Sequence, residues 1–263
     1  MLALPYYGST STFYRIRPGV VLKSPVQVWE KSAHRHKLSE RITNSFVVER
    51  QILEKLGDHP RIIFGYDDTT DIKGFLLAEA SHGNLQTYID ENNALIGDSL
   101  RRKWCWQAAE AIAYLHENGV IHSDLRPENF LVHATTEVSL DLWLCDFGGS
   151  TCTELNLGGG HLPDDPFFDP TQPWISTPAT DIFSLGSIFY TILTGHWPYK
   201  SCGSFETGEG KYDYQRRVNA LFSQKKFPDV TGLAGGKVVM GCWMKRYGTV
   251  NEILRDLETE MQR

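Results

Sequence analysis

The spacing of hydrophobic residues changes along the chain. In residues 6–24, β-branched and aromatic residues alternate around turn signals at 8–10 and 17–19, a pattern that predicts three short antiparallel strands. Residues 61–66 and 75–79 are typical of two more strands. The first part of the chain is therefore expected to form a small β-sheet.

Most of the remaining spacing is helical. Apolar residues recur every three or four positions at 45–56, 99–119, 214–222 and 249–261, which predicts amphipathic helices. Residues 182–193 are almost continuously apolar and predict a buried helix, because the run is too short and too interrupted by Ser and Gly to span a bilayer. A strand-rich part with one helix is thus followed by a mainly helical part.

Residues 120–131 have an apolar start, a polar centre and an apolar end, as expected of a loop between two buried anchors. Asp124, Arg126 and Asn129 lie on this loop, and Asp146 ends a later hydrophobic run. Carboxylates, an amide oxygen and a cation are suited to binding a polyphosphate with its metal while a hydroxyl group is aligned. These residues are candidates for one shared site.

Two sequence motifs resemble those of a known family. Residues 122–129 read His-Ser-Asp-Leu-Arg-Pro-Glu-Asn, and residues 146–148 read Asp-Phe-Gly. In order and spacing they resemble the catalytic loop and the metal-binding triplet of eukaryotic protein kinases. One departure is Ser123, where the family usually has Arg.

The resemblance implies an α+β, bilobal fold. Residues 1–79 would form an N-lobe with a small antiparallel sheet and one main helix, and residues 80–263 a larger, mainly α-helical C-lobe. A length of 263 residues suits one large domain or two lobes, so we expect a single kinase-like domain over residues 1–263.

Lys23 and Glu49 are the expected N-lobe partners. Lys23 ends a short apolar strand, and Glu49 lies on the predicted helix in the Glu-x-x-Ile-Leu context of the family's mobile helix. The resemblance implies an ion pair that orients Lys23 toward the α- and β-phosphates of ATP. The alternatives are two solvated surface charges.

The resemblance also assigns roles in the C-lobe. Asp124 would accept or align the proton of the substrate hydroxyl, and Arg126 would neutralise the transferring phosphoryl group. Asn129 and Asp146 would bind the nucleotide together with Mg²⁺, or Mn²⁺ in its place. His122 would brace the turn around Asp146.

The nucleotide pocket has a weaker signature. Leu77 would lie at the back of the adenine site, and the backbone of Ala78 and Ala80 would hydrogen-bond the base. Only Gly8 remains of the family's phosphate-covering Gly-x-Gly-x-x-Gly flap, with Thr10 and Phe13 at the other positions. A plain hairpin turn is an equal interpretation of this stretch.

Three further expectations concern acidic residues. By resemblance, Asp181 would brace the catalytic-loop backbone, although a helix-capping role is the alternative. Asp169 is expected to replace the Glu of the missing Ala-Pro-Glu motif and to pair with Arg246. Asp164 and Asp165 either favour a basic peptide or face solvent.

Ser123 bears on regulation. A serine cannot bind the phosphate that an Arg at this position receives from the activation segment. The segment after Asp146 is polar, contains three consecutive glycines at 158–160, and looks like a mobile activation segment. We expect activity to be independent of phosphorylation at Ser150, Thr151, Thr153, Thr171, Ser176 and Thr177.

Composition limits the location and the partners. A net charge of −6 gives no overall attraction to nucleic acid or to anionic lipid, and the basic residues 31–37 are interpreted as a solvated face or a mobile loop. The five cysteines are scattered and odd in number, and no signal-peptide pattern is present. These features favour a cytoplasmic or otherwise intracellular protein with reduced thiols.

Four functions remain in view. The first is an ATP-dependent kinase acting on Ser or Thr of an unknown protein substrate. The second is a pseudokinase that acts as a nucleotide-sensing module or scaffold, which the degraded flap and Ser123 favour. Dual-specificity or tyrosine kinases and small-molecule kinases are the others, and the sequence predicts no oligomeric state.

Overall fold

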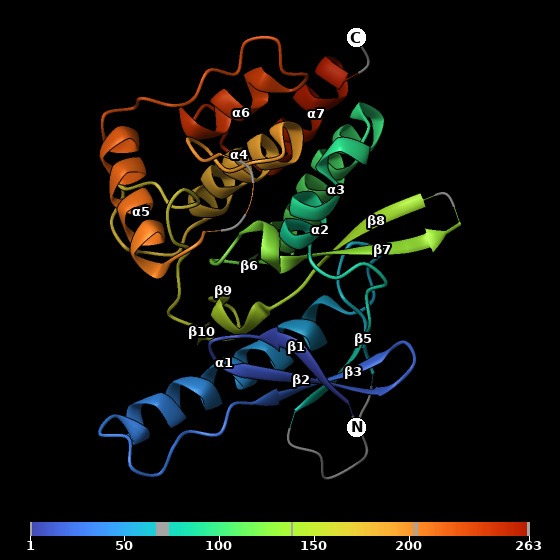
Figure 1. Ribbon diagram of the computed structural model, residues 1–263, viewed down its shortest axis with the longest axis vertical. Coiled ribbons are helices and arrows are strands. Elements are labelled where there is room, and N and C mark those ends of the chain that lie inside the picture. The colour runs from blue at the N-terminus through green and yellow to red at the C-terminus, as the bar shows by residue number, and fades with distance from the viewer. Residues whose placement is uncertain (1, 67–73, 138, 202, 204, 262–263) are drawn as a thin grey trace.

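The computed structural model describes the chain except residues 1, 67–73, 138, 202, 204 and 262–263. The described residues form a strand-rich lobe with one long helix and a mainly helical lobe, with short strands between them (Figure 1). This arrangement confirms the expected α+β, bilobal fold.

The N-lobe sheet has five strands in the order β1-β2-β3-β5-β4, all antiparallel. Of the three strands expected in residues 6–24, the second and third are present, whereas the first begins at Leu2 and lies mostly before residue 6. The strand expected at 75–79 is present and ends one residue early, at Ala78. The prediction for 61–66 was wrong except at its end, because Ile63 donates its N–H to the carbonyl of Leu144 in the other lobe, at 2.9 Å. The strands are β1 Leu2–Tyr7, β2 Ser11–Arg17, β3 Val20–Pro25, β4 Gly65–Tyr66 and β5 Phe75–Ala78.

Helix α1, Arg35–Leu56, packs beside this sheet and begins ten residues before the predicted start at residue 45. Its early turns are polar, so apolar spacing gave no sign of them. The buried stripe includes Val48, Glu49 and Ile52. The basic residues 31–37 are solvated, as expected, and the last three of them belong to the helix rather than to a loop.

The C-lobe is built around α4, which is buried along most of its length. Helix α6 approaches it closely because residue 186 is glycine: a Cβ atom there would lie 2.9 Å from Cys242 Cβ. The short helices α2 and α6 were not predicted. The helices are α2 Leu85–Asn92, α3 Asp98–Glu117, α4 Pro178–Thr194, α5 Gly208–Ser223, α6 Gly236–Trp243 and α7 Val250–Met261.

Short strands between the lobes hold the loops that carry the candidate residues. Strand β7 pairs with β8 in antiparallel fashion, and β6 pairs with β9, which pairs with β10. The candidate catalytic loop connects β6 to β7, and Asp146 follows β8. These strands are β6 Val120–Ile121, β7 Phe130–Thr136, β8 Ser139–Leu144, β9 Thr151–Cys152 and β10 Leu157–Gly158, with 3₁₀ turns η1 Asn93–Leu95, η2 Pro127–Asn129 and η3 Phe147–Gly149.

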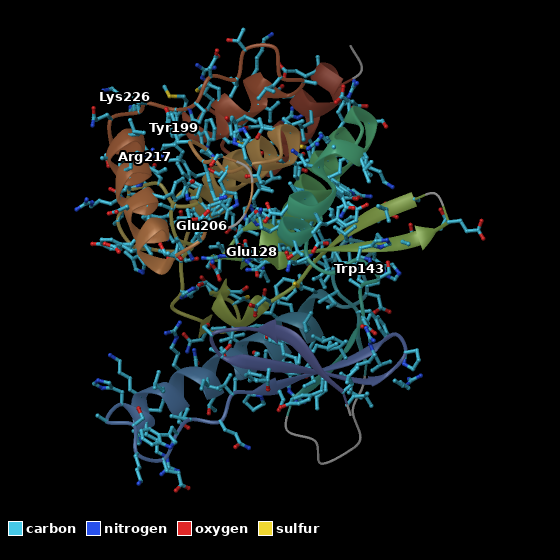
Figure 2. The ribbon with its side chains drawn as sticks, viewed as in Figure 1. Glu128, Trp143, Tyr199, Glu206, Arg217 and Lys226 are labelled. Atoms are coloured by element: carbon cyan, nitrogen blue, oxygen red, sulfur yellow. The ribbon has the colours of Figure 1, made fainter. Side chains whose placement is uncertain are left out.

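Side-chain bonds to the backbone fix the outer part of the C-lobe. On α5, Arg217 donates to the carbonyl of Tyr199 at 2.6 Å, and the Tyr199 hydroxyl donates to the carbonyl of Lys226 at 3.1 Å (Figure 2). The first bond joins α5 to the segment before it, and the second joins that segment to the chain after α5.

The expected partner of Asp169 was wrong. Asp169 Oδ2 lies 2.5 Å from the Nζ atom of Lys245, and among the described residues no ion pair joins Asp169 to Arg246. Lys245 is the second residue after the end of α6 and has a φ of +54°, a left-handed conformation.

Within the described part of the chain, no helix combines the length and the apolar character required to cross a bilayer. The four cysteines there, Cys105, Cys145, Cys152 and Cys242, are free thiols. Cys202 lies outside the described residues.

Candidate active site

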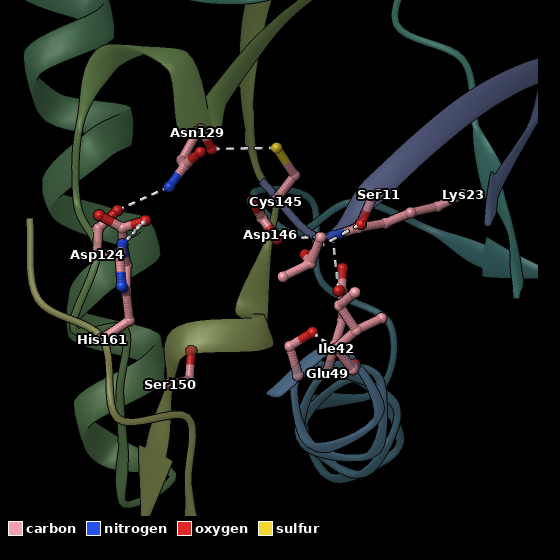
Figure 3. Close-up of polar contacts among 12 residues, drawn as sticks. Ser11, Lys23, Ile42, Glu49, Asp124, Asn129, Cys145, Asp146, Ser150 and His161 are labelled. Atoms are coloured by element: carbon pink, nitrogen blue, oxygen red, sulfur yellow. Dashed lines mark hydrogen bonds and ion pairs between the residues drawn. The ribbon is translucent and has the colours of Figure 1, made fainter. Parts of the chain in front are cut away.

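Lys23 lies between two carboxylates. Its Nζ atom is 2.6 Å from Glu49 Oε2 and 2.6 Å from Asp146 Oδ1 (Figure 3). The ion pair expected between Lys23 and Glu49 is therefore present, with side chains that are only 4% and 2% exposed. Burial alone would lower the pKa of Lys23, but the charges of Asp146 and Glu49 raise it above its ordinary value, so the ammonium group stays charged.

Asp146 reaches Lys23 through an unusual backbone conformation. It adopts φ +62° and ψ +70°, and the 3₁₀ turn η3 follows at once. Phe147 is fully buried, 5.3 Å from the ring of His122 between centroids. A Cβ at Gly148 would lie 3.1 Å from Ser45 Cβ on α1, so this loop and α1 are in close contact. The position of α1 is thereby linked to that of Asp146.

Asp146 remains ionised. Burial tends to raise its pKa, but the nearby Lys23 ammonium lowers the pKa below the ordinary value for Asp. Its side chain is 47% exposed. An ionised carboxylate that solvent can still reach is chemically suited to binding a divalent cation.

Asp181 holds the start of the catalytic loop. Its Oδ2 accepts the backbone N–H of His122 at 2.8 Å, and its Oδ1 accepts that of Ser123 at 3.0 Å. The bracing contacts expected of Asp181 are therefore present. Thr177 forms the N-cap of α4 through a capping box, so Asp181 is not a cap. His116 Nε2 also contacts Asp181 Oδ2, at 3.0 Å.

Two contacts join the catalytic loop to the strand that leads to Asp146. The ring nitrogen Nε2 of His122 lies 3.0 Å from the carbonyl oxygen of Cys145, which agrees with the expected bracing of this turn. The N–H of Cys145 donates to the carbonyl of Asn129 at 2.9 Å. Asn129 Nδ2 donates a hydrogen bond to the carbonyl of Asp124 at 2.7 Å. The amide oxygen Oδ1 of Asn129 is therefore the atom available as a metal ligand.

Asp124 lies between the side chains of Arg126 and His161. Its Oδ1 is 3.3 Å from Arg126 Nε, and its Oδ2 is 3.6 Å from His161 Nε2. Burial raises the pKa of the Asp124 carboxyl group, while Arg126 and His161 oppose that rise. A partly desolvated carboxylate is a better proton acceptor than one in water.

A cavity of about 410 Å³ opens beside these groups. Its walls include every residue predicted to bind the nucleotide, and Glu128 lines it from the C-lobe side (Figure 2). The predicted residues in the wall are Gly8, Lys23, Leu77, Ala78, Ala80, Asn129 and Asp146. Residues far apart in sequence therefore share one cavity.

The backbone N–H groups of Gly8 and Ala78, both predicted to lie at the nucleotide, are hydrogen-bonded within the protein. Gly8 lies in the turn between β1 and β2 and donates its N–H to the carbonyl of Ser11 at 3.0 Å, as in a hairpin turn. The N–H of Ala78 donates to the carbonyl of Phe64 at 2.9 Å, so this group is already occupied.

Sequence reasoning missed several residues of the cavity wall. Val21 and Leu131 each lie two positions from a predicted site residue, on strands β3 and β7. Alternate strand residues share a face, so this periodicity could have identified Val21, which lies on β3 together with Lys23. Leu4 and Phe13 also line the cavity. His161 had no local signal, because only folding brings it to Asp124.

A family model for the protein kinase domain matches residues 20–233, most of the chain. The chain belongs to the protein kinase family. The match begins at the first residue of β3 and includes all the candidate site residues except Gly8.

Several serine/threonine-protein kinases are similar to this kinase-family chain. SBK2 of Rattus norvegicus is 30% identical over 64% of the chain, PKH3 of Eremothecium gossypii is 28% identical over 81%, and SIK1 of Rattus norvegicus is 29% identical over 56%. The aligned regions make up 48%, 31% and 19% of these relatives, so the chain spans less than half of their length.

Proposed function

We propose that this chain is an ATP-dependent serine/threonine kinase, which transfers the γ-phosphoryl group of Mg-ATP to a Ser or Thr hydroxyl of a protein substrate. The observation that supports this most is the position of Lys23, 2.6 Å from both Glu49 and Asp146 at the wall of the cavity. A charged lysine held by two acids from separate elements is preorganised to meet a polyphosphate.

In this proposal the cavity binds the nucleotide. Leu77, Ala78 and Ala80 would surround the adenine, and the hairpin at Gly8 would cover the phosphates. Lys23 would contact the α- and β-phosphates, with Glu49 keeping its side chain in place. Burial of both members of the ion pair supports this, because a buried charge keeps its position when its partner is fixed.

Asn129 and Asp146 are proposed to hold Mg²⁺, or Mn²⁺ in its place. The oxygen donors fit such a hard cation: Asp146 is ionised and half exposed, and the amide nitrogen of Asn129 is already bonded to Asp124. When bound, the metal would neutralise charge on the phosphates.

Asp124 and Arg126 are proposed to act on the acceptor. Asp124 would orient the substrate hydroxyl and accept its proton, and the raised pKa of Asp124 supports that assignment. Arg126 would stabilise negative charge on the transferring group. Its guanidinium lies 3.3 Å from Asp124, so the two groups face the same region.

A nucleotide-sensing pseudokinase is the second candidate. Phe13, at a position where the family has glycine, lines the cavity together with Leu4. Large side chains at this wall favour a protein that binds nucleotide without efficient transfer, because phosphate-binding flaps depend on close backbone approach.

Radiolabelled ATP with Mg²⁺ and a peptide library containing Ser, Thr or Tyr acceptors would separate these functions. We expect wild-type protein to label Ser or Thr peptides, and Lys23→Ala and Asp146→Ala to lose at least about 100-fold of that activity. Equal labelling by all three proteins would remove the enzyme proposal. A nucleotide-induced thermal shift without any labelling would favour the pseudokinase.

The proposed domain organisation and cellular location follow from the order of the elements, the thiols and the charge. We propose that residues 1–79 and 80–263 are the two lobes of one kinase-like domain, since β5 ends at Ala78 and the C-lobe helices follow. The free thiols support an intracellular location, and the net charge of −6 supports a protein partner rather than nucleic acid.

A further inference from the structure

Two glycine-rich stretches, residues 148–149 and 158–160, pack backbone against backbone. A Cβ atom at Gly159 would overlap the carbonyl oxygen of Gly148 and the backbone of Gly149. The N–H of Gly159 donates to the carbonyl of Ser150 at 2.9 Å. Only glycine at position 159 permits this approach, so the glycine run draws the segment after β10 against the loop after Asp146.

The close packing of Gly159 against residues 148–149 places His161 beside Asp124. Both side chains pack against Gly149: a Cβ atom at Gly149 would lie 3.2 Å from His161 Cβ and 3.5 Å from Asp124 Cβ. His161 Nε2 lies 3.6 Å from Asp124 Oδ2 (Figure 3). That distance is too long for a good hydrogen bond but short enough for the ring to touch the carboxylate.

The two oxygens of Asp124 face different partners. Arg126 lies 3.3 Å from Oδ1, and His161 lies 3.6 Å from Oδ2. Rotation of a carboxylate about its last bond has only broad preferences, so its orientation depends on neighbours. His161 is 41% exposed, while the Asp124 side chain is 16% exposed, so the imidazole covers the more buried carboxylate from the solvent side.

We propose that His161 is a positioning residue that holds the carboxylate of Asp124 in its orientation toward the acceptor hydroxyl. The inference rests on the proposed function, because it concerns how Asp124 performs its step. His161 and Arg126 act as two lateral supports, one for each oxygen. Removal of His161 leaves Asp124 in place but free to turn toward Arg126.

The kinetic test compares His161→Ala and His161→Gln with wild type, using a peptide that the wild-type protein phosphorylates. We expect kcat to fall about tenfold in His161→Ala, with the KM for ATP nearly unchanged, because orientation of the acceptor and not nucleotide binding is lost. The glutamine variant, which retains a side-chain donor, should recover part of the loss. His36→Gln, on the exposed start of α1, is the matched control.

Variants in the glycine run 158–160 provide a second kinetic test. Gly159→Ala should lower kcat, whereas Gly158→Ala should not, because a Cβ at Gly158 has open space around it. The combination of Gly159→Ala with His161→Ala should lower kcat no further than the larger single effect, since both act through the same support. Multiplication of the two losses would overturn the proposal, as would an unchanged kcat in His161→Ala.

A measurement without turnover separates this inference from the proposed function. In protein with isotope-labelled histidine, the ring signal of His161 is identified by its loss in His161→Gln. Asp124→Asn should shift that signal and leave the His36 signal in place. An unmoved His161 signal would overturn the contact. A wild-type protein without kinase activity would instead overturn the proposed function, and with it the effect of His161 on turnover. The ring shift would still decide whether His161 contacts Asp124.

Discussion

Asp181 Oδ1 accepts the backbone N–H of Ser123 at 3.0 Å, from a helix 58 positions further along the chain. Ser123 has a φ of +73°, a conformation that a residue other than glycine adopts only when its surroundings fix it. One buried carboxylate therefore holds the backbone that carries Asp124, the next residue.

Replacement of Asp181 by Asn should destabilise the protein. The variant keeps one acceptor oxygen and loses the charge shared by the N–H groups of His122 and Ser123, so we expect the free energy of unfolding to fall by about 2 kcal/mol. Urea unfolding measures this change. Asp213→Asn, at an exposed carboxylate, is the control, and equal stability of the two variants would contradict the bracing role.

Glu49→Gln tests the buried ion pair. The amide cannot supply the negative charge that fixes Lys23, although Asp146 still contacts the ammonium group at 2.6 Å. We expect kcat/KM for peptide phosphorylation to fall roughly 100-fold. Glu40→Gln on the same helix is the control, because that side chain is 67% exposed. A loss of less than about twofold in Glu49→Gln would show that Lys23 needs no help from α1.

Activity should not require phosphorylation of the activation segment. The Ser123 hydroxyl contacts that of Ser176 and donates to the carbonyl of Ile121 at 3.3 Å, so no cation stands at this position to receive a phosphate. Phosphatase-treated protein, with phosphate loss verified by mass spectrometry, should retain activity within about twofold. Abolished turnover after treatment would refute this expectation.

Asp165→Asn should stabilise the protein above neutral pH. Burial raises the pKa of Asp165 to about 6, despite a hydrogen bond from Asn219 at 3.3 Å. The folded protein therefore binds a proton more tightly than the unfolded chain does. Stability falls as the pH rises from the ordinary Asp pKa of 3.8 to about 6, and the full cost of ionising this group applies above that pH. The substitution removes that cost.

We expect Asp165→Asn to gain about 1–2 kcal/mol at pH 8, after allowance for partial solvent exposure, and to gain little at pH 4, which is close to the ordinary Asp pKa of 3.8. Thermal unfolding across this pH range measures the difference. A gain that is the same at both pH values would show that the ionisation of Asp165 is not its source.

Periodic segments were predicted well, and their boundaries less well. Strands β2 and β3 and helices α3 and α7 follow from apolar spacing, because their buried faces repeat with the period of the element. Helix α4 follows from a continuous apolar run, because it is buried along most of its length. The early turns of α1 and the helices α2 and α6 gave no such signal. The early turns of α1 are polar and solvated, and helices α2 and α6 are only eight residues long.

The sequence by itself determined the types of groups in the site and their places on loops. Asp124, Asn129 and Asp146 each lie within three residues of a short strand with buried apolar residues, and removal of such residues from water is favourable. Local spacing and motif letters carry that information, so the cavity wall could be predicted in large part from residues alone.

Only the tertiary structure decided which groups meet. The second carboxylate on Lys23, the choice of Lys245 for Asp169, and the contact of His161 with Asp124 each depend on backbones that are distant in sequence and closely packed in space. No local period records such contacts, because they are fixed by turn conformations and by the absence of a side chain at positions such as Gly159.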